Sequence, residues 1–118
     1  MRSVTPISMA RLTLYRIVHT DPPTEHDFLS KMMLGFRSRK EEHDRPELWT
    51  GLSMYDSMAA ARATAQDFPV LGAYIAAVDI DHVDSRLVVA RQTLRPGHYT
   101  VWAAPEALRA AVVAVAPA

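Results

Sequence analysis

An arginine among aliphatic residues is the first feature of this sequence that could do chemistry. The run 11–19 alternates with period two, as a strand does, and Arg16 shares one of its faces with Leu14 and Val18. Burying a guanidinium costs several kcal/mol unless its charge is paired. Its planar donors suit a phosphate or a carboxylate, so Arg16 is a candidate anion-binding residue. An internal pair with an aspartate such as Asp79, or a place at a surface edge, would account for it equally well.

The segment around residue 50 places two aromatic rings, a glycine and a hydroxyl on one face of an expected strand. These residues are Trp49, Gly51, Ser53 and Tyr55. A glycine inside a strand often marks a place where a ligand or another backbone comes close. The ring of Tyr55 could stack on a flat ligand ring, and Ser53 could hold an amide or position a catalytic group. The alternative interpretation is an ordinary aromatic core face.

Two histidines complete the set of candidate binding residues. His19 ends the first expected strand, and strand ends are common places for binding residues. His98 shares a strand face with Thr100 and Trp102, and it could serve in proton transfer or hydrogen bonding. A solvated loop histidine at position 19 and an edge strand with a half-buried Trp102 are the alternatives.

The elements that would position these residues follow from periodicity and capping signals. We expect strands at 11–19, 48–55, 73–80, 86–92, 98–102 and 111–116, and helices that begin at Thr24, at 56–57 and at Pro105. The first helix would end at Gly35 and carry a stripe of core side chains: Phe28, Leu29, Met32 and Met33. Residues 95–98 would form a type II turn. Because the later strands follow one another through short links, we expect an α+β domain with a mixed, largely antiparallel sheet of five to six strands and two to three short helices.

Composition restricts the class of protein. The 118 residues have the size of one domain, which we expect over 11–118 after a flexible leader at 1–10. Lys and Arg together number 13, and Asp and Glu together also number 13, so the formal net charge is zero. The strong basic field of a nucleic-acid-binding protein is therefore missing. The sequence has no cysteine and no apolar run long enough to span a membrane, and we expect a cytoplasmic protein without membrane contact.

The motifs of several common sites are absent from the sequence. The glycines form neither a dinucleotide-binding nor a phosphate-binding loop; they are Gly35, Gly51, Gly72 and Gly97. No two histidines have the helical spacing of metal ligands, so no metal is expected. The acidic stretch 79–84 lacks the glycine and final glutamate of a calcium-binding loop, which favours a strand-end turn.

Taken together, the candidate residues resemble the ADP-ribosyltransferase fold, a compact sheet domain of bacterial toxins and related NAD-consuming enzymes. That family has an arginine on its first strand, as in Leu14-Tyr15-Arg16-Ile17-Val18, and a serine near an aromatic on a following strand, as in 49–55. A helix of small residues comes next, as at 58–65. The resemblance implies NAD as a substrate, with Arg16 on its phosphates, Ser53 supporting the nicotinamide site and Tyr55 stacking nearby.

The resemblance also bears on the catalytic acid. The family carries a catalytic glutamate on a late strand, and the one glutamate after Ser53 is Glu106, expected at a helix start behind Pro105. The resemblance implies a catalytic set of Arg16, Ser53 and Glu106 where the fold brings the glutamate in, with His19 and His98 at the rim of the pocket. Otherwise catalysis is altered, or the domain binds its ligand without reacting.

Two functions therefore stand beside each other. The first is an ADP-ribosyltransferase-like domain that binds NAD, a related nucleotide or another small molecule, and transfers ADP-ribose or hydrolyses NAD. The alternative is a non-catalytic interaction or regulatory module, in which the charged segment 37–47 and an aromatic sheet face hold a protein partner. Nucleic-acid binding is not expected, because no basic stripe accompanies the aromatic residues.

Overall fold

The computed structural model describes residues 12–35 and 44–118, so the expected leader and residues 37–43 of the charged segment lie outside the described residues. The strands are β1 (Thr13–Val18), β2 (Leu52–Tyr55), β3 (Tyr74–Asp79), β4 (Val88–Gln92), β5 (His98–Ala103) and β6 (Val112–Pro117). The α-helices are α2 (Pro46–Thr50), α3 (Met58–Asp67) and α4 (Pro105–Ala110), and 3₁₀ helices form η2 (Glu25–Phe28), η3 (Pro69–Leu71) and η4 (Ile80–His82). The expected α+β class is confirmed.

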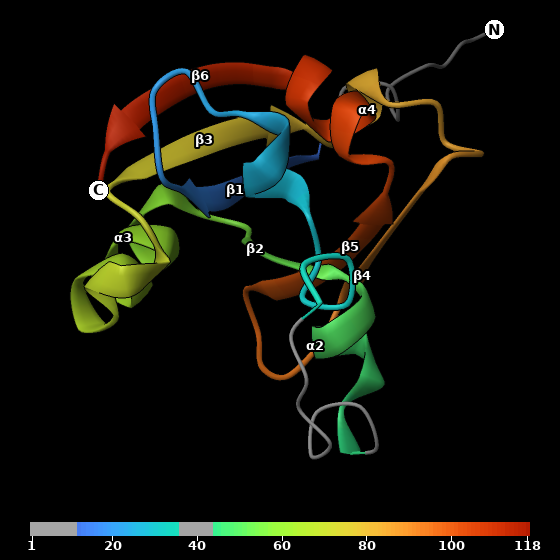
Figure 1. Cartoon of the computed structure of the whole chain (residues 1–118), viewed down its shortest axis with the longest axis horizontal. Coiled ribbons are helices and arrows are strands. Elements are labelled where there is room, and N and C mark those ends of the chain that lie inside the picture. Colours follow the sequence, from blue (N-terminus) through green and yellow to red (C-terminus); the bar gives the residue numbers. More distant parts are fainter. Residues whose placement is uncertain (1–11, 36–43) are drawn as a thin grey trace, which may run out of the picture.

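All six strands form one antiparallel sheet in the order β4-β5-β2-β1-β3-β6 (Figure 1). β1 and β3 pair along six residues, from Thr13 opposite Asp79 to Val18 opposite Tyr74. β1 and β2 pair at one position only, Tyr15 opposite Tyr55. The sheet therefore consists of two well-paired halves that are joined at a short junction and diverge beyond it.

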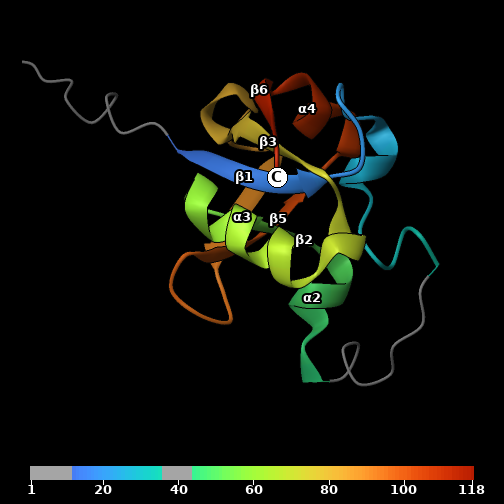
Figure 2. The same ribbon diagram turned by 90° about the vertical axis from the view of Figure 1, so that its left-hand side faces the viewer.

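Each face of the sheet has its own apolar core. On one face, Leu14 and Val18 of β1 pack in a cluster with Phe28 of η2 and Leu108 of α4. On the other face, Ile17 packs with two small residues of α3, Ala61 and Ala65, as the small-residue helix predicted. Figure 2 shows α3 and α4 on opposite sides of β1. Successive side chains of β1 point to opposite faces of the sheet, so Leu14 and Val18, the aliphatic neighbours of Arg16, lie on the α4 side.

The helix expected after Thr24 is reduced to one 3₁₀ turn. The capping box formed by Thr24 and Asp27 is present, and Phe28 is buried as predicted. Beyond it the chain leaves the helix at Leu29, and a turn at 31–35 follows. Met32 and Met33 are 43% and 51% exposed, so their expected place in the core is wrong.

The segment before β2 is a helix and not the first half of a strand. Pro46 occupies the first turn of α2, where its fixed φ and missing N–H are tolerated. The helix brings Thr50 within reach of β5, and the Trp102 indole N–H donates a hydrogen bond of 2.9 Å to the Thr50 hydroxyl. Trp49 therefore does not share a strand face with Ser53 and Tyr55.

Other local expectations agree with the structure. The His98 N–H bonds to the Arg95 carbonyl at 3.1 Å and Gly97 has a φ of +87°, which is the geometry expected of a type II turn. The Ser57 side chain caps α3 by accepting from the Ala60 N–H, and α4 begins at Pro105. Within the described residues, no helix combines the length and the apolar character needed to cross a bilayer.

Candidate functional site

A cavity of about 480 Å³ lies at the end of β1 and the start of β2, where the two halves of the sheet diverge. Five of the candidate residues of the sequence analysis line it: Arg16, His19, Gly51, Ser53 and Tyr55. Arg16 and His19 come from β1 and its end, whereas Ser53 and Tyr55 come from β2. The fold thus brings together residues that are more than thirty positions apart in the chain. This cavity is the candidate site.

The Arg16 guanidinium bridges the two strands and η2 through backbone carbonyls. Its Nη1 donates to the Ser53 carbonyl at 2.9 Å, and its Nε donates to the Asp27 carbonyl at 3.1 Å. Ser53 lies just beyond the single β1–β2 pair, so the arginine supplies a donor where the backbone ladder has ended. An arginine has five N–H donors. Those not used in these two bonds have no partner within the described residues.

The charge of Arg16 has no direct counter-ion in the described residues. Burial lowers the pKa of Arg16 to about 10, and the charges of Asp27 and Tyr55 oppose this shift. The group is still a cation at neutral pH. The expected alternative of a pair with Asp79 is not formed, because Asp79 lies on β3, opposite Thr13. A partly buried cation that faces a cavity without an ion pair is suited to an anionic ligand.

The wall of the cavity contains basic side chains and apolar ones. Besides Arg16, the charged or chargeable nitrogen groups that line it belong to His19, His26 and Lys31. No described aspartate or glutamate lines it. The apolar side chains include Leu29, Leu34, Leu48, Val70 and Leu71. This combination suits a ligand with an anionic part and a flat or apolar part.

His98 lies behind Tyr55 and not at the rim of the cavity. It is 3% exposed and is absent from the lining, so the expected rim position is wrong. Its ring meets the Tyr55 ring edge-on, with 5.5 Å between centroids. Its Nδ1 lies 3.2 Å from the Thr93 hydroxyl, which is 2.7 Å from the Thr100 hydroxyl. Burial lowers the pKa of His98, so a neutral imidazole supports the Tyr55 ring.

Gly51 is required by the packing of β5 side chains. A Cβ at this position would overlap the Thr100 methyl group and lie 3.0 Å from the Trp102 ring. The close approach that a strand glycine suggested is therefore made by protein side chains. Gly51 also lines the cavity, at the point where α2 ends and β2 begins.

Glu106 lies outside the candidate site. Pro105 places it in the first turn of α4, where it is exposed, and it is not among the lining residues. α4 packs next to η2 and carries Leu108 into the core, and Ala111 is buried just after the helix ends. The buried face of the helix is thus apolar, and the glutamate stays on the outer side.

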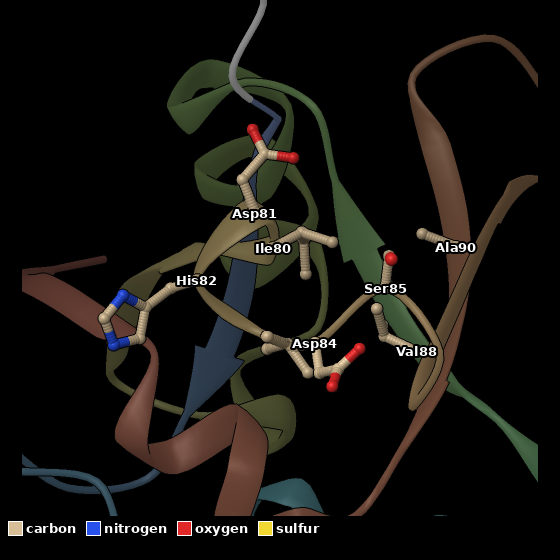
Figure 3. Close-up of a pocket in the computed structure, with 8 residues that line it drawn as sticks. Ile80, Asp81, His82, Asp84, Ser85, Val88 and Ala90 are labelled. Atoms are coloured by element: carbon tan, nitrogen blue, oxygen red, sulfur yellow. The ribbon is translucent and has the colours of Figure 1, made fainter. Parts of the chain in front are cut away.

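A second hollow, of about 360 Å³, lies along residues 80–85 and β4. Asp84 and Ser85 lie close to Val88 and Ala90 there, whereas His82 points away from them (Figure 3). The Asp84 carboxylate is already bound by the backbone N–H and the guanidinium of Arg86, the latter at 2.7 Å. Asp81 accepts from the Leu12 N–H at 2.7 Å. Within residues 12–35 and 44–118, no three acidic or histidine side chains gather as metal ligands would.

Several lining residues carry no signal that sequence reasoning could have used. His26 and Lys31 stand on segments for which helical periodicity placed other residues inward, and Leu48 was expected on a strand. The signal that was present is Asp27, whose capping-box position next to His26 could be read from the sequence. Comparisons with protein-family models, with curated proteins and with solved structures found no match for this chain.

Proposed function

We propose that this chain is a small ADP-ribosyltransferase-like domain that binds NAD or a related nucleotide in the cavity between β1 and β2. The observation that supports it most is the Arg16 guanidinium, which lines the cavity as a cation and is held by two carbonyls rather than by a carboxylate. A dehydrated cation gains most from an anion that arrives with the ligand. A dinucleotide offers both the anion and the flat rings that the apolar wall would take.

Each lining residue has a role in this proposal. The donors of Arg16 that the protein leaves unused would hold phosphate oxygens, and the Tyr55 ring would stack on a ligand ring. The edge contact of His98 keeps that ring in place. The Ser53 carbonyl already accepts from Arg16, so Ser53 acts first by fixing the guanidinium. We place the protein in the cytoplasm, since a chain without cysteine has no disulfide to gain in an oxidising compartment.

The chemistry that the cavity could support is limited by its charges. Breaking an N-glycosidic bond builds positive charge on the sugar, which an anionic group stabilises. No described carboxylate lines the cavity, and Glu106 lies on α4. We therefore expect ligand binding to be the main activity and transfer or hydrolysis to be slow. A release of nicotinamide that falls in Glu106→Gln would restore the catalytic role implied by the resemblance.

The test is calorimetric titration of the protein with NAD and with ADP-ribose. We expect saturable binding that weakens roughly tenfold in Arg16→Lys, because a lysine keeps the charge but loses the planar fork. Arg62→Lys is the matched control, since Arg62 is an exposed arginine whose Nη2 donates to the Pro117 carbonyl, away from the cavity. Circular dichroism would check that both variants are folded. Wild-type protein that binds neither compound would refute the proposal.

The second candidate is a non-catalytic protein-interaction module. Apolar side chains continue outward from the cavity, with Val70 84% exposed and Phe68 59% exposed. Exposed apolar groups next to a cavity without a carboxylate favour a binding surface over an active site. Absence of NAD binding, together with loss of a protein partner on Val70→Ser, would favour this candidate.

A further inference from the structure

Asp27 is a buried residue that binds or adjoins three residues of the cavity wall: Arg16, His19 and His26. Its carbonyl accepts from the Arg16 Nε at 3.1 Å, and its Oδ1 accepts from the His19 backbone N–H at 2.9 Å. His26 precedes it in η2, and Arg16, His19 and His26 all line the cavity. Asp27 is 5% exposed, so this arrangement is part of the packed structure.

The carboxylate of Asp27 is already engaged by the backbone. Oδ1 binds the His19 N–H and Oδ2 binds the Thr24 N–H at 3.0 Å, which fixes the loop between β1 and η2. The two imidazole rings are exposed at the cavity wall, and no described acidic residue lines that wall. A charged imidazole donates from both ring nitrogens, whereas a phosphate monoester offers three oxygens and nearly two negative charges.

We propose that His19 and His26 form a second anion subsite beside Arg16, and that this subsite takes a phosphate monoester of the ligand. The inference rests on the proposed function, because it concerns the same cavity and a nucleotide bound in it. The preferred ligand is then a dinucleotide that carries one phosphate monoester in addition to its pyrophosphate. Such a ligand presents two separate anions, one for the Arg16 guanidinium and one for the two imidazole rings.

NAD and NADP are the sharpest pair of probes, because they differ by a single phosphate monoester. Titration calorimetry at low ionic strength should show NADP binding roughly tenfold tighter than NAD, as expected for charge-assisted hydrogen bonds at a partly exposed site. In the double variant His19→Gln and His26→Gln, the ratio of the two dissociation constants should fall to about one. The glutamines keep the backbone bond from His19 to Asp27 and should leave the fold intact.

His82→Gln is the matched control, since His82 is exposed and lies at the other hollow. It should keep the preference for NADP. Equal affinity of the wild-type protein for NAD and NADP would overturn the second subsite and leave the proposed function in place. Failure of both compounds to bind would overturn the two proposals together. A preference that survives in the double variant would assign the phosphate monoester to other residues and also overturn the inference.

Discussion

β1 has two neighbours in the sheet, and it pairs with them very differently. Toward β3 it forms a ladder of six residue pairs, whereas toward β2 it forms one. The first junction is closed by backbone hydrogen bonds and by the packing of Gly72 against Val18. At the second, an arginine side chain supplies a hydrogen bond to a carbonyl beyond the last pair. The cavity thus lies where the backbone pairing of β1 stops early.

This difference also explains why a guanidinium stands in an otherwise largely apolar site. Backbone groups that leave a ladder need other partners or water. Arg16 meets part of that need, and the price is a partly buried charge whose pKa is lowered by burial. The β3 side needs no such group, because the backbone of β1 pairs with that of β3 along six residues.

The largest expected effect is the loss of stability when the junction between β1 and β3 is disrupted. An alanine Cβ at Gly72 would overlap the Val18 carbonyl, at a backbone φ of +149° that side chains rarely adopt. We expect Gly72→Ala to lower the free energy of unfolding by about 3 kcal/mol or more. Urea denaturation would measure it. In Gly35→Ala, also at positive φ but with no atom within 4 Å of the new Cβ, the loss should be about 1 kcal/mol. Equal losses would contradict the clash.

A smaller loss of stability is expected at the junction between β1 and β2. Arg16→Met keeps an unbranched side chain but removes the donors to the Ser53 and Asp27 carbonyls. We expect a loss of about 1–3 kcal/mol, since each carbonyl loses its partner while a buried charge is also removed. Arg62→Met removes one exposed hydrogen bond to the Pro117 carbonyl and should cost less than about 1 kcal/mol. Equal costs for the two variants would show that Arg16 does not tie β1 to β2.

The smallest expected effect is on the pH dependence of stability, and it comes from His98 on β5, the other neighbour of β2. Burial lowers the pKa of His98 below its ordinary value of 6.5, the Thr93 backbone bond opposes this, and the charge of Arg95 adds to it. Below pH 6.5 the unfolded chain therefore binds more protons than the folded one, and stability falls as the pH drops. His98→Gln should flatten the decline below pH 6.5, measured by urea denaturation at each pH. An unchanged slope would mean that other groups cause the decline.

The strands could be predicted where a local pattern was enough. The alternation in 13–18 and the turn at 95–98 depend on neighbours in the chain, and both are confirmed. The prediction of a helix after Thr24 is wrong beyond Phe28. The Asp27 carboxylate binds the His19 N–H there and ties the segment to the end of β1. At 48–50, Pro46 and the hydrogen bond from Trp102 to Thr50 favour a helix over the expected strand.

The candidate site was predicted in part for the same reason. Arg16, Ser53 and Tyr55 are unusual for their own strands, and they do meet at one cavity. His98 was misplaced because alternation gives the face of a strand but not which neighbour covers it. His26 was missed, since its place at the cavity depends on how η2 packs against β1.

By itself the sequence determined most of the strands and the turn at 95–98, and it marked Arg16 as a charge in an aliphatic strand. Periodicity and capping depend on residues that are close together in the chain, so they can be recognised from the sequence alone. The order β4-β5-β2-β1-β3-β6 and the early end of the β1–β2 ladder were decided by the tertiary structure. Strand order depends on contacts between distant segments, and only those contacts leave a gap in which a guanidinium faces a cavity.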